Sequence, residues 1–455
     1  MDVFTRLESE VRGYCRGWPT VFTTARGSTL RDENGRDFLD FFAGAGTLNY
    51  GHNDPALKQR LLDYLAADNI VHSLDMHTAA KRRFLERFDE IVLKPRGLDY
   101  KVQFPGPAGN HAVEAALKLA RKYTGRETVV SFTNAFHGMT LGALAVTGNS
   151  MKRTGAGVPL GHGVTMPYDN YLDGRTPDFL LFETMLDDSG SGLDKPAAVI
   201  VETVQGEGGV NVASAEWLRG LAGVCERHGI LLIVDDVQMG CGRTGAFFSF
   251  EDAGITPDIV CLSKSLSGFG LPFAITLMRR DLDVWEPGEH NGTFRGFNPA
   301  FVTAAGALED HWADDGMAER TLAKGGLVRR ALDEIALRHA GEIADVRGRG
   351  LVWGMETRDP RTASRICAEA FGRGLLMETS GPNDEVVKLL PPLTTTEDEL
   401  ARGLAILADS VAAVQAAGPK ETGPKETGAA GARAAGGPGG AGAQAGPGAR
   451  AAVHA

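Results

Sequence analysis

The sequence predicts an α/β protein: a large domain with a mainly parallel central sheet, plus a small α+β domain assembled from both chain ends. Two observations predict this fold. Apolar, strand-like runs alternate with amphipathic helices between about residues 75 and 300. Both flanks instead mix short strands and helices in irregular order. Regular alternation is typical of parallel sheets, because a parallel pair of strands needs a crossover connection that is usually a helix.

The composition excludes several classes of protein. The chain has 455 residues with 47 basic and 58 acidic side chains, a formal net charge of −11. This balance argues against nucleic-acid binding, which requires a basic surface. No apolar run reaches the ~18–20 residues of a membrane-spanning helix. The first residues lack the basic and apolar segments of a secretory signal, so we expect none. We expect a cytoplasmic protein with no nucleic-acid or membrane partner.

The five cysteines are scattered and include no Cys-x-x-Cys pair. Their odd number and wide spacing argue against a disulfide framework and against a zinc site. The histidines match no ligand spacing either, so we expect no metal.

The centre of the chain contains a βαβ unit. The apolar runs 197–201 and 230–234 are predicted strands, and residues 215–228 between them place apolar side chains on one helical face before Gly229 ends the helix. A strand, a helix and a strand in this order predict a parallel pair with a right-handed crossover. The further elements predicted for the large domain are strands over 258–262 and 273–277 and a helix over 111–124.

The flanks supply the small domain. Residues 21–42 are predicted to form a hairpin that turns at 33–35, where Asn34-Gly35 allows the positive φ angles of a tight turn. The later elements are a helix over 327–337, a strand over 350–355, a helix over 364–372 and a closing helix that starts at the capping box Thr396-x-x-Glu399. We therefore divide the chain at 1–74, 75–300 and 301–417. Residues 418–455, rich in Gly, Ala and Pro, are predicted to be a disordered tail.

Polar side chains follow two of the apolar strands. Asp235 and Asp236 come directly after the strand 230–234, and Lys264 follows the strand 258–262. In open α/β sheets, ligands bind at the carboxyl ends of the strands. An aspartate there can also cap a turn, and a lone lysine is usually a solvated charge. Two acids on so apolar a strand favour a site, and a lysine in apolar surroundings can act as a nucleophile with a lowered pKa.

A third stretch, residues 106–110, is rich in small residues and leads into the helix 111–124. Backbone N–H groups at a helix N-terminus bind anions such as phosphate. A phosphate cradle, a carboxylate for a pyridinium nitrogen and an amine are the groups that a protein contributes to pyridoxal 5′-phosphate chemistry. The three stretches together predict this cofactor.

These stretches resemble the class III, fold-type I aminotransferases. The resemblance rests on DDVQMGCGRTG at 235–245, LSKSLSG at 262–268, QGEGG at 205–209 and Phe136-His137-Gly138, and it covers about residues 1–411. It implies a seven-stranded, mainly parallel sheet and a pyridoxal 5′-phosphate-dependent enzyme that works by ping-pong transamination.

Four further segments resemble a narrower family, the diaminobutyrate–2-oxoglutarate aminotransferases of ectoine biosynthesis. They are ESEVRGYCRGWPTVF at 8–22, DFFAGAGTLNYGHN at 40–53, EHNGTFRGFNPAFVTA at 289–304 and KLLPPLT at 388–394. This resemblance implies transfer of the amino group of L-glutamate to L-aspartate 4-semialdehyde. The products would be 2-oxoglutarate and L-2,4-diaminobutyrate, the first step toward ectoine.

The resemblance also implies a role for each site residue. Lys264 would bond the cofactor and move the substrate proton, and Asp235 would keep the pyridine nitrogen protonated. Gln238 would bond the phenolic oxygen. The remaining cofactor-binding residues are Phe136 and His137 at the ring, Gly109 and Asn110 at the phosphate, and Thr293, which would reach the phosphate of the neighbouring subunit. A homodimer or a dimer of dimers with shared active sites follows from the role of Thr293.

Substrate residues are expected nearby. Glu207 resembles an acidic residue that pairs with a mobile arginine in relatives. Lys388 stands where many relatives have the arginine that binds the α-carboxylate of glutamate, and lysine cannot form the bidentate contact. Asn49 and Tyr50, in the glycine-flanked loop 44–52, are further candidates for substrate contact.

Other functions stay open. The same scaffold could exchange another ω-amine such as 4-aminobutyrate or ornithine, serve a siderophore through diaminobutyrate, or act as a mutase or racemase. A catalytically silent cofactor-binding homologue is the alternative outside the enzymes. The presence of Lys264, Asp235 and Gln238 together argues against a silent homologue.

Overall fold

The computed structural model describes residues 2–172, 174–176 and 178–418, and the chain up to Ala416 forms one compact unit. Apart from Gly418, the predicted tail at 418–455 lies outside the described residues. The domain boundaries after residues 74 and 300 stay a prediction. None of the helices in the described ranges combines the length and the apolar character that a membrane-spanning helix needs.

The large sheet has seven strands within the described residues, in the order β4-β12-β11-β10-β7-β5-β6. All neighbouring strands run parallel except those paired with β12, which is antiparallel to both β11 and β4. The predicted, mainly parallel sheet is therefore confirmed. The strands are β4 (Tyr100–Gln103), β5 (Val129–Phe132), β6 (Gly163–Met166), β7 (Ala198–Val201), β10 (Leu231–Asp235), β11 (Ile259–Leu262) and β12 (Ile275–Arg279).

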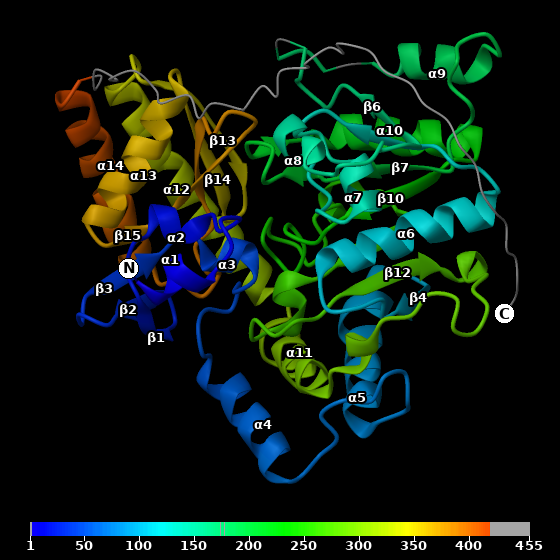
Figure 1. Ribbon diagram of the computed structural model, residues 1–455, viewed down its shortest axis with the longest axis horizontal. Coiled ribbons are helices and arrows are strands. Elements are labelled where there is room, and N and C mark those ends of the chain that lie inside the picture. Colours follow the sequence, from blue (N-terminus) through cyan, green and yellow to red (C-terminus); the bar gives the residue numbers. More distant parts are fainter. Residues whose placement is uncertain (1, 173, 177, 419–455) are drawn as a thin grey trace, which may run out of the picture. The chain divides into compact units, whose positions relative to one another are not determined.

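Helices cover both faces of this sheet. Helix α6 (Gly109–Thr124) crosses one face (Figure 1), where its apolar side chains pack with Leu231 and Ile233 of β10. Helix α10 (Ala215–His228) belongs to the apolar core of the other face, with Leu232 and Val234. Successive side chains of a strand point to opposite faces, so the alternation along β10 directs its last residue, an acid, toward the side of α6.

Both chain ends build the smaller part of the fold, as predicted. The N-terminal strands β1 (Phe22–Arg26), β2 (Thr29–Asp32) and β3 (Asp37–Asp40) form an antiparallel meander, and β15 (Leu375–Leu376) adds to it in parallel beside β3. In Figure 1 these blue strands lie beside the yellow and orange C-terminal helices. The sequence predicted a single hairpin here. The structure has a second tight turn at Gly27, whose φ of 56° suits glycine.

A second small sheet has the order β13-β14-β17-β16. Its strands are β13 (Ile343–Arg349), β14 (Val352–Thr357), β16 (Glu378–Ser380) and β17 (Val386–Leu389). The helices packed around it are α12 (Gly316–Arg338), α13 (Pro360–Gly372) and α14 (Glu397–Ala416). The predicted capping box forms: the N–H of Thr396 donates to Oε2 of Glu399 at 2.9 Å, and the N–H of Glu399 donates to Oγ1 of Thr396 at 3.2 Å.

Nine further α-helices lie in the described residues. The longer ones are α4 (Pro55–Ala66), α5 (Ala79–Phe88), α9 (Leu180–Asp187) and α11 (Asn298–His311). The short ones are α1 (Val3–Leu7), α2 (Tyr14–Gly17), α3 (Ala43–Gly46), α7 (Leu141–Ala145) and α8 (Ser150–Thr154). Strand β12 begins two residues after the predicted 273, at Ile275, which pairs with Leu262, the last residue of β11.

Candidate active site

A cavity of about 670 Å³ lies at the carboxyl ends of β10 and β11, beside the first turn of α6. This is the edge of the sheet where the sequence places its polar residues. The cavity brings together most of the predicted site residues: Gly109, Asn110, Phe136, His137, Glu207, Asp235, Gln238 and Lys264. They come from segments that are far apart in the chain, so the fold assembles them.

Asp235 and His137 form a buried pair in this cavity. Nδ1 of His137 lies 2.7 Å from Oδ2 of Asp235, and the N–H of Val237 donates to Oδ1 of Asp235 at 3.2 Å. Burial alone lowers the pKa of His137, but the hydrogen bond and the charge of Asp235 outweigh burial and raise this pKa above its ordinary value. Nε2 of His137 is buried and has no hydrogen-bond partner among the described residues.

Lys264 enters the cavity from a strained position. It follows β11 and has a φ of 50°, in the left-handed region that a side chain rarely adopts. The next residue fixes this turn, because Oγ of Ser265 donates to the carbonyl of Gly46 at 2.7 Å. Burial lowers the pKa of Lys264, and the charge of Glu207 acts in the opposite direction. A lysine with a lowered pKa has more of its amine unprotonated and is a better nucleophile and base.

The first turn of α6 forms a cradle for an anion. Gly109 and Asn110 begin this helix and line the cavity. A Cβ atom at Gly109 would lie 2.7 Å from Cγ1 of Val237, too close for a real side chain. The glycine therefore lets the start of α6 lie close to Val237 at the cavity, where the positive end of the helix dipole favours a phosphate.

Phe136 is held by an acid that our sequence analysis missed. The N–H of Phe136 donates to Oε2 of Glu202 at 3.0 Å, and Glu202 also lines the cavity. Burial raises the pKa of Glu202 to about 8. Glu202 directly follows the apolar strand β7, so the signal that pointed to Asp235 was present here too. Lys152 lies over the ring of Phe136, with Nζ 4.2 Å from the ring centroid.

Glu207 and Lys388 meet, but Lys388 is not among the described residues that line the cavity. Nζ of Lys388 lies 2.7 Å from Oε1 of Glu207 and 2.9 Å from Oε1 of Glu378, and the lysine side chain is fully buried. Burial would raise the pKa of Glu207, but the charges of Lys388 and Lys264 outweigh it and lower this pKa to about 2. Oε1 of Glu207 also accepts from Nε2 of Gln238 at 3.1 Å. No pattern in the sequence pointed to Glu378.

The structure does not bring two of the predicted substrate residues into the cavity. Nδ2 of Asn49 donates to the carbonyl of Cys241 at 2.9 Å, and its Oδ1 accepts from Arg243 at 2.5 Å. The hydroxyl of Tyr50 accepts from Nε1 of Trp312 at 2.8 Å. The polar atoms of both side chains are thus bonded within the core, and neither residue is among the described lining of the cavity.

Thr293 is also absent from the described lining of its own chain's cavity. Its carbonyl lies 2.7 Å from Nε2 of His72. A role in the cavity of a neighbouring subunit stays a prediction.

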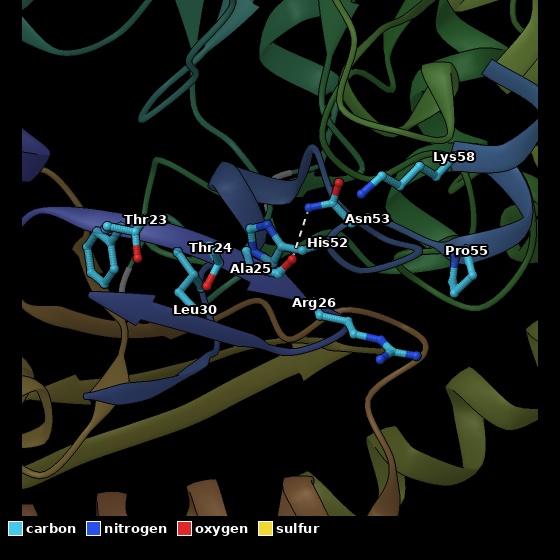
Figure 2. Close-up of a pocket in the computed structure, with 10 residues that line it drawn as sticks. Thr23, Thr24, Ala25, Arg26, Leu30, His52, Asn53, Pro55 and Lys58 are labelled. Atoms are coloured by element: carbon cyan, nitrogen blue, oxygen red, sulfur yellow. Dashed lines mark hydrogen bonds between the residues drawn. The ribbon is translucent and has the colours of Figure 1, made fainter. Parts of the chain in front are cut away.

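A second cavity, of about 750 Å³, lies between β1 and the start of α4. Figure 2 shows Asn53 reaching from the loop before α4 to the carbonyl of Ala25, to which its Nδ2 donates at 2.9 Å. Arg26 and Lys58 give this cavity a basic rim. None of the predicted site residues is among its described lining, so the cavity beside β10 is the candidate active site.

Comparison with known proteins agrees with this geometry. The family model described as aminotransferase class-III matches residues 15–411. The chain is a class III aminotransferase. The family resemblance inferred from the sequence motifs is thereby confirmed, and so is the expected fold.

Several relatives of this aminotransferase carry the name diaminobutyrate–2-oxoglutarate transaminase. The one from Streptomyces avermitilis is 65% identical over 412 residues, which cover 90% of this chain and 97% of the relative. The one from Nocardia farcinica is 66% identical and covers 90% and 94% of the two chains. The one from Halalkalibacterium halodurans is 57% identical and covers 91% and 97%.

Solved structures share the fold of this aminotransferase. An ornithine aminotransferase from Toxoplasma gondii matches with a TM-score of 0.78 at 25% identity, over 91% of this chain and 94% of that one. An amine transaminase from an uncultivated Pseudomonas species, crystallised with pyridoxal phosphate bound, matches with a TM-score of 0.77 at 27% identity, over 90% and 98%.

Class III aminotransferases depend on pyridoxal 5′-phosphate, so this aminotransferase uses that cofactor. The residues present fit it. The open cradle at Gly109 suits a phosphate, and the carboxylate of Asp235 suits a protonated ring nitrogen. The amine of Lys264 suits the aldehyde carbon. Nε2 of His137 has no hydrogen-bond partner among the described residues, and a polar group of the cofactor could supply one.

Proposed function

We propose that this aminotransferase moves the amino group of L-glutamate to L-aspartate 4-semialdehyde, giving 2-oxoglutarate and L-2,4-diaminobutyrate, as the first step of ectoine biosynthesis. One observation carries the proposal. Relatives with this transaminase name are 55–66% identical to the chain over 90% or more of its length. The basis for the pathway is the resemblance of four sequence segments to the ectoine family.

Pyridoxal 5′-phosphate, when bound, receives the amino group and delocalises the electron pair left on the substrate carbon. The chain supplies the acid–base and positioning groups around it. We assign the proton transfer at the substrate carbon to Nζ of Lys264, because burial lowers its pKa and so leaves more of the amine free to accept a proton. Asp235 would hold the proton on the ring nitrogen, and the 2.7 Å contact with His137 fixes the orientation of its carboxylate.

The other cavity residues position the cofactor in this proposal. Gly109 and Asn110 would bind the phosphate at the start of α6, and Phe136 would pack against the ring. Nε2 of Gln238 donates to the carbonyl of Ala45 at 2.9 Å and to Oε1 of Glu207 at 3.1 Å, so Gln238 would bond the phenolic oxygen by exchanging one of these two contacts. These contacts fix the cofactor relative to Lys264, which is the positioning that proton transfer requires.

We also propose a homodimer or a dimer of dimers in the cytoplasm. Thr293 would complete the phosphate site of the neighbouring subunit. Apolar side chains near Thr293 and near the cavity are strongly exposed, which supports an interface there: Phe294 62%, Met139 55%, Leu141 54%, Ile70 53%. The five cysteines are free, as a reducing compartment requires.

Half-reactions of the holoenzyme test the substrate. The yellow enzyme is mixed separately with L-2,4-diaminobutyrate, L-glutamate, 4-aminobutyrate and ornithine, and the visible band of the cofactor is followed. We expect fast bleaching by diaminobutyrate and glutamate but not by the other two. Bleaching by 4-aminobutyrate or ornithine instead would keep the chemistry and overturn the substrate. An enzyme without any visible band would contradict the assignment of the site itself.

A further inference from the structure

The C-terminal hairpin carries a carboxylate that the proposed reaction does not use. Strands β16 and β17 are antiparallel, and their register sets Glu378 opposite Lys388. Nζ of Lys388 lies 2.9 Å from Oε1 of Glu378 and 2.7 Å from Oε1 of Glu207. A single ammonium group therefore faces two carboxylates, and the contact from Glu207 to Gln238 links this cluster to the cavity.

The three groups lie at increasing depth. The side chain of Glu207 is 22% exposed and lines the cavity, that of Glu378 is 9% exposed, and that of Lys388 is fully buried. Charges at this depth interact strongly because little water screens them. Burial raises the pKa of Glu378, and the charge of Lys388 offsets this only in part, because the charge of Glu207 acts in the same direction as burial. The charges of Glu378 and Glu207 also add to the effect of burial in raising the pKa of the Tyr14 phenol.

The proposed substrates differ at the carbon next to the reacting nitrogen. In glutamate this carbon also bears a carboxylate, whereas C4 of diaminobutyrate bears hydrogen in its place. A carboxylate at that position is repelled by Glu207 and attracted by Lys388. The balance of these two effects depends on how much of the charge of Lys388 is already compensated by Glu378.

We propose that Glu378 is a specificity-determining positioning residue, whose ion pair holds the ammonium of Lys388 away from the cavity and so favours a reacting carbon without a carboxylate. The inference rests on the proposed function for the identity of the two substrates. Glu378 is not among the described residues that line the cavity, so it would act through Lys388 and Glu207.

Glu378→Gln removes the charge and keeps the shape of the side chain. Single-turnover bleaching of the holoenzyme gives kcat/KM for glutamate and for diaminobutyrate separately. We expect the ratio of the glutamate value to the diaminobutyrate value to rise about tenfold, the effect of one partly screened buried charge. An unchanged ratio, or an equal loss in both half-reactions, would overturn the inference, because a purely structural role lowers both values together.

Two controls isolate the effect. Asp384→Asn removes an exposed acid from the same hairpin and should leave the ratio unchanged. In a Lys388→Met background, Glu378→Gln should shift the ratio by less than about twofold, because residues that act through one another are not additive. A tenfold shift in that background would show that Glu378 acts without Lys388 and would contradict the proposal.

Two further outcomes are separable. If Glu378→Gln does not fold, Glu378→Asp, which lengthens the contact to Lys388, should shift the ratio in the same direction. If the unaltered enzyme does not react with diaminobutyrate, the proposed function fails. The ratio of the glutamate value to the value for whichever ω-amine the enzyme accepts is then measured instead. If this ratio is the same in Glu378→Gln and in the unaltered enzyme, the role of Glu378 is contradicted independently of the proposed function.

Discussion

Oδ2 of Asp235 lies 2.7 Å from Nδ1 of His137, and both side chains are buried at the edge of the sheet where its parallel strands end. The acid closes β10, while the imidazole comes from the loop after β5. This contact raises the pKa of His137 against the effect of burial. It therefore fixes both the orientation of the carboxylate and the position of a proton beside the cofactor site.

Replacing Lys264 by Ala should abolish turnover and leave the fold intact. In the proposed function the amine both bonds the cofactor and moves the substrate proton, and loss of such a group lowers the rate by ~10³-fold or more. Steady-state assays measure the loss, and far-ultraviolet circular dichroism checks the fold. Lys195→Ala, at an exposed position, is the matched control and should keep full activity. Multiple turnover by the Lys264→Ala variant would refute the assignment.

Replacing Glu202 by Gln should stabilise the protein increasingly as the pH rises. The pKa of Glu202 is about 8 in the folded protein, against an ordinary value of 4.5 that we take for the unfolded chain. As the pH rises, the unfolded chain therefore loses this proton before the folded protein does. Between these values the free energy of unfolding of the unaltered protein falls with pH, by roughly 1 kcal/mol per pH unit from this group. The neutral amide of the Glu202→Gln variant does not ionise, so the variant carries no such cost.

Chemical denaturation of both proteins across that pH interval measures the difference. The curve for Glu202→Gln should rise above that of the unaltered protein as the pH approaches 8. Parallel curves would mean that Glu202 is ionised in the folded state, against this expectation.

Replacing Gly109 by Ala should weaken cofactor binding. The added Cβ would lie 2.7 Å from Cγ1 of Val237, so the start of α6 or the loop after β10 must shift. We expect the Kd for pyridoxal 5′-phosphate to rise about tenfold or more, which corresponds to ~1.4 kcal/mol. Gly372→Ala, where no described atom lies within 4 Å of the new Cβ, should leave the Kd unchanged. Equal affinities in both variants would contradict the phosphate cradle.

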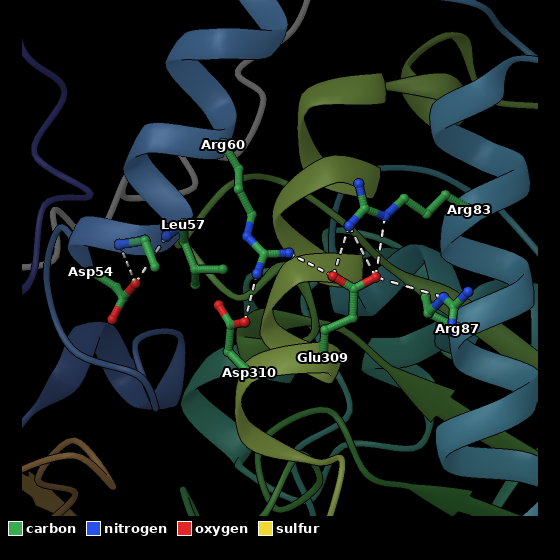
Figure 3. Close-up of polar contacts among 8 residues, drawn as sticks. Asp54, Leu57, Arg60, Arg83, Arg87, Glu309 and Asp310 are labelled. Carbon is green, nitrogen blue, oxygen red and sulfur yellow. Dashed lines mark hydrogen bonds and ion pairs between the residues drawn. The ribbon is translucent and has the colours of Figure 1, made fainter.

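Replacing Glu309 by Gln should destabilise the packing of three helices. Figure 3 shows its carboxylate on α11 between Arg60 of α4 and Arg83 and Arg87 of α5. The shortest contacts are 2.6 Å to Nη1 of Arg60 and 2.8 Å to Nη2 of Arg83. Because these charges are partly exposed, we expect a loss of roughly 1–2 kcal/mol that shrinks as salt is added.

Urea denaturation at low and high salt measures this loss. Asp310→Asn is the matched control, because Asp310 contacts Arg60 alone among the described arginines of Figure 3. Its effect should be the smaller of the two. A loss that does not depend on salt would show that Glu309 acts through packing rather than charge.

Local pattern was sufficient for most of the large sheet. The predicted helix 215–228 coincides with α10, and the predicted strand 197–201 differs from β7 by one residue. These elements carry strong periodicity and clear end signals, so neighbouring residues decide them. The turn at Gly27 escaped notice because a lone glycine is weaker evidence than Asn34-Gly35.

The same reasoning found part of the site. Acids and a lysine after apolar strands pointed to Asp235 and Lys264, and both line the cavity. Alternation along β10 also separates the two successive acids: Asp236 turns away and accepts from the N–H of Ser249 at 3.0 Å. Asn49 was predicted to contact the substrate because it lies in a glycine-flanked loop, but its side chain is bonded within the core. No local pattern shows on which side a loop packs.

The sequence by itself determined strands such as β7, helices such as α10 and the chemical groups available to the cofactor, since these depend on spacing along a few neighbouring residues. The tertiary structure decided which groups meet. Glu207 and Lys388 are 181 positions apart, and their 2.7 Å contact depends on how two sheets pack together. Glu378 joins them through the register of a hairpin. Contacts between distant segments depend on how all the intervening elements pack. The arrangement of charges around Lys388 could therefore be seen only in the tertiary structure.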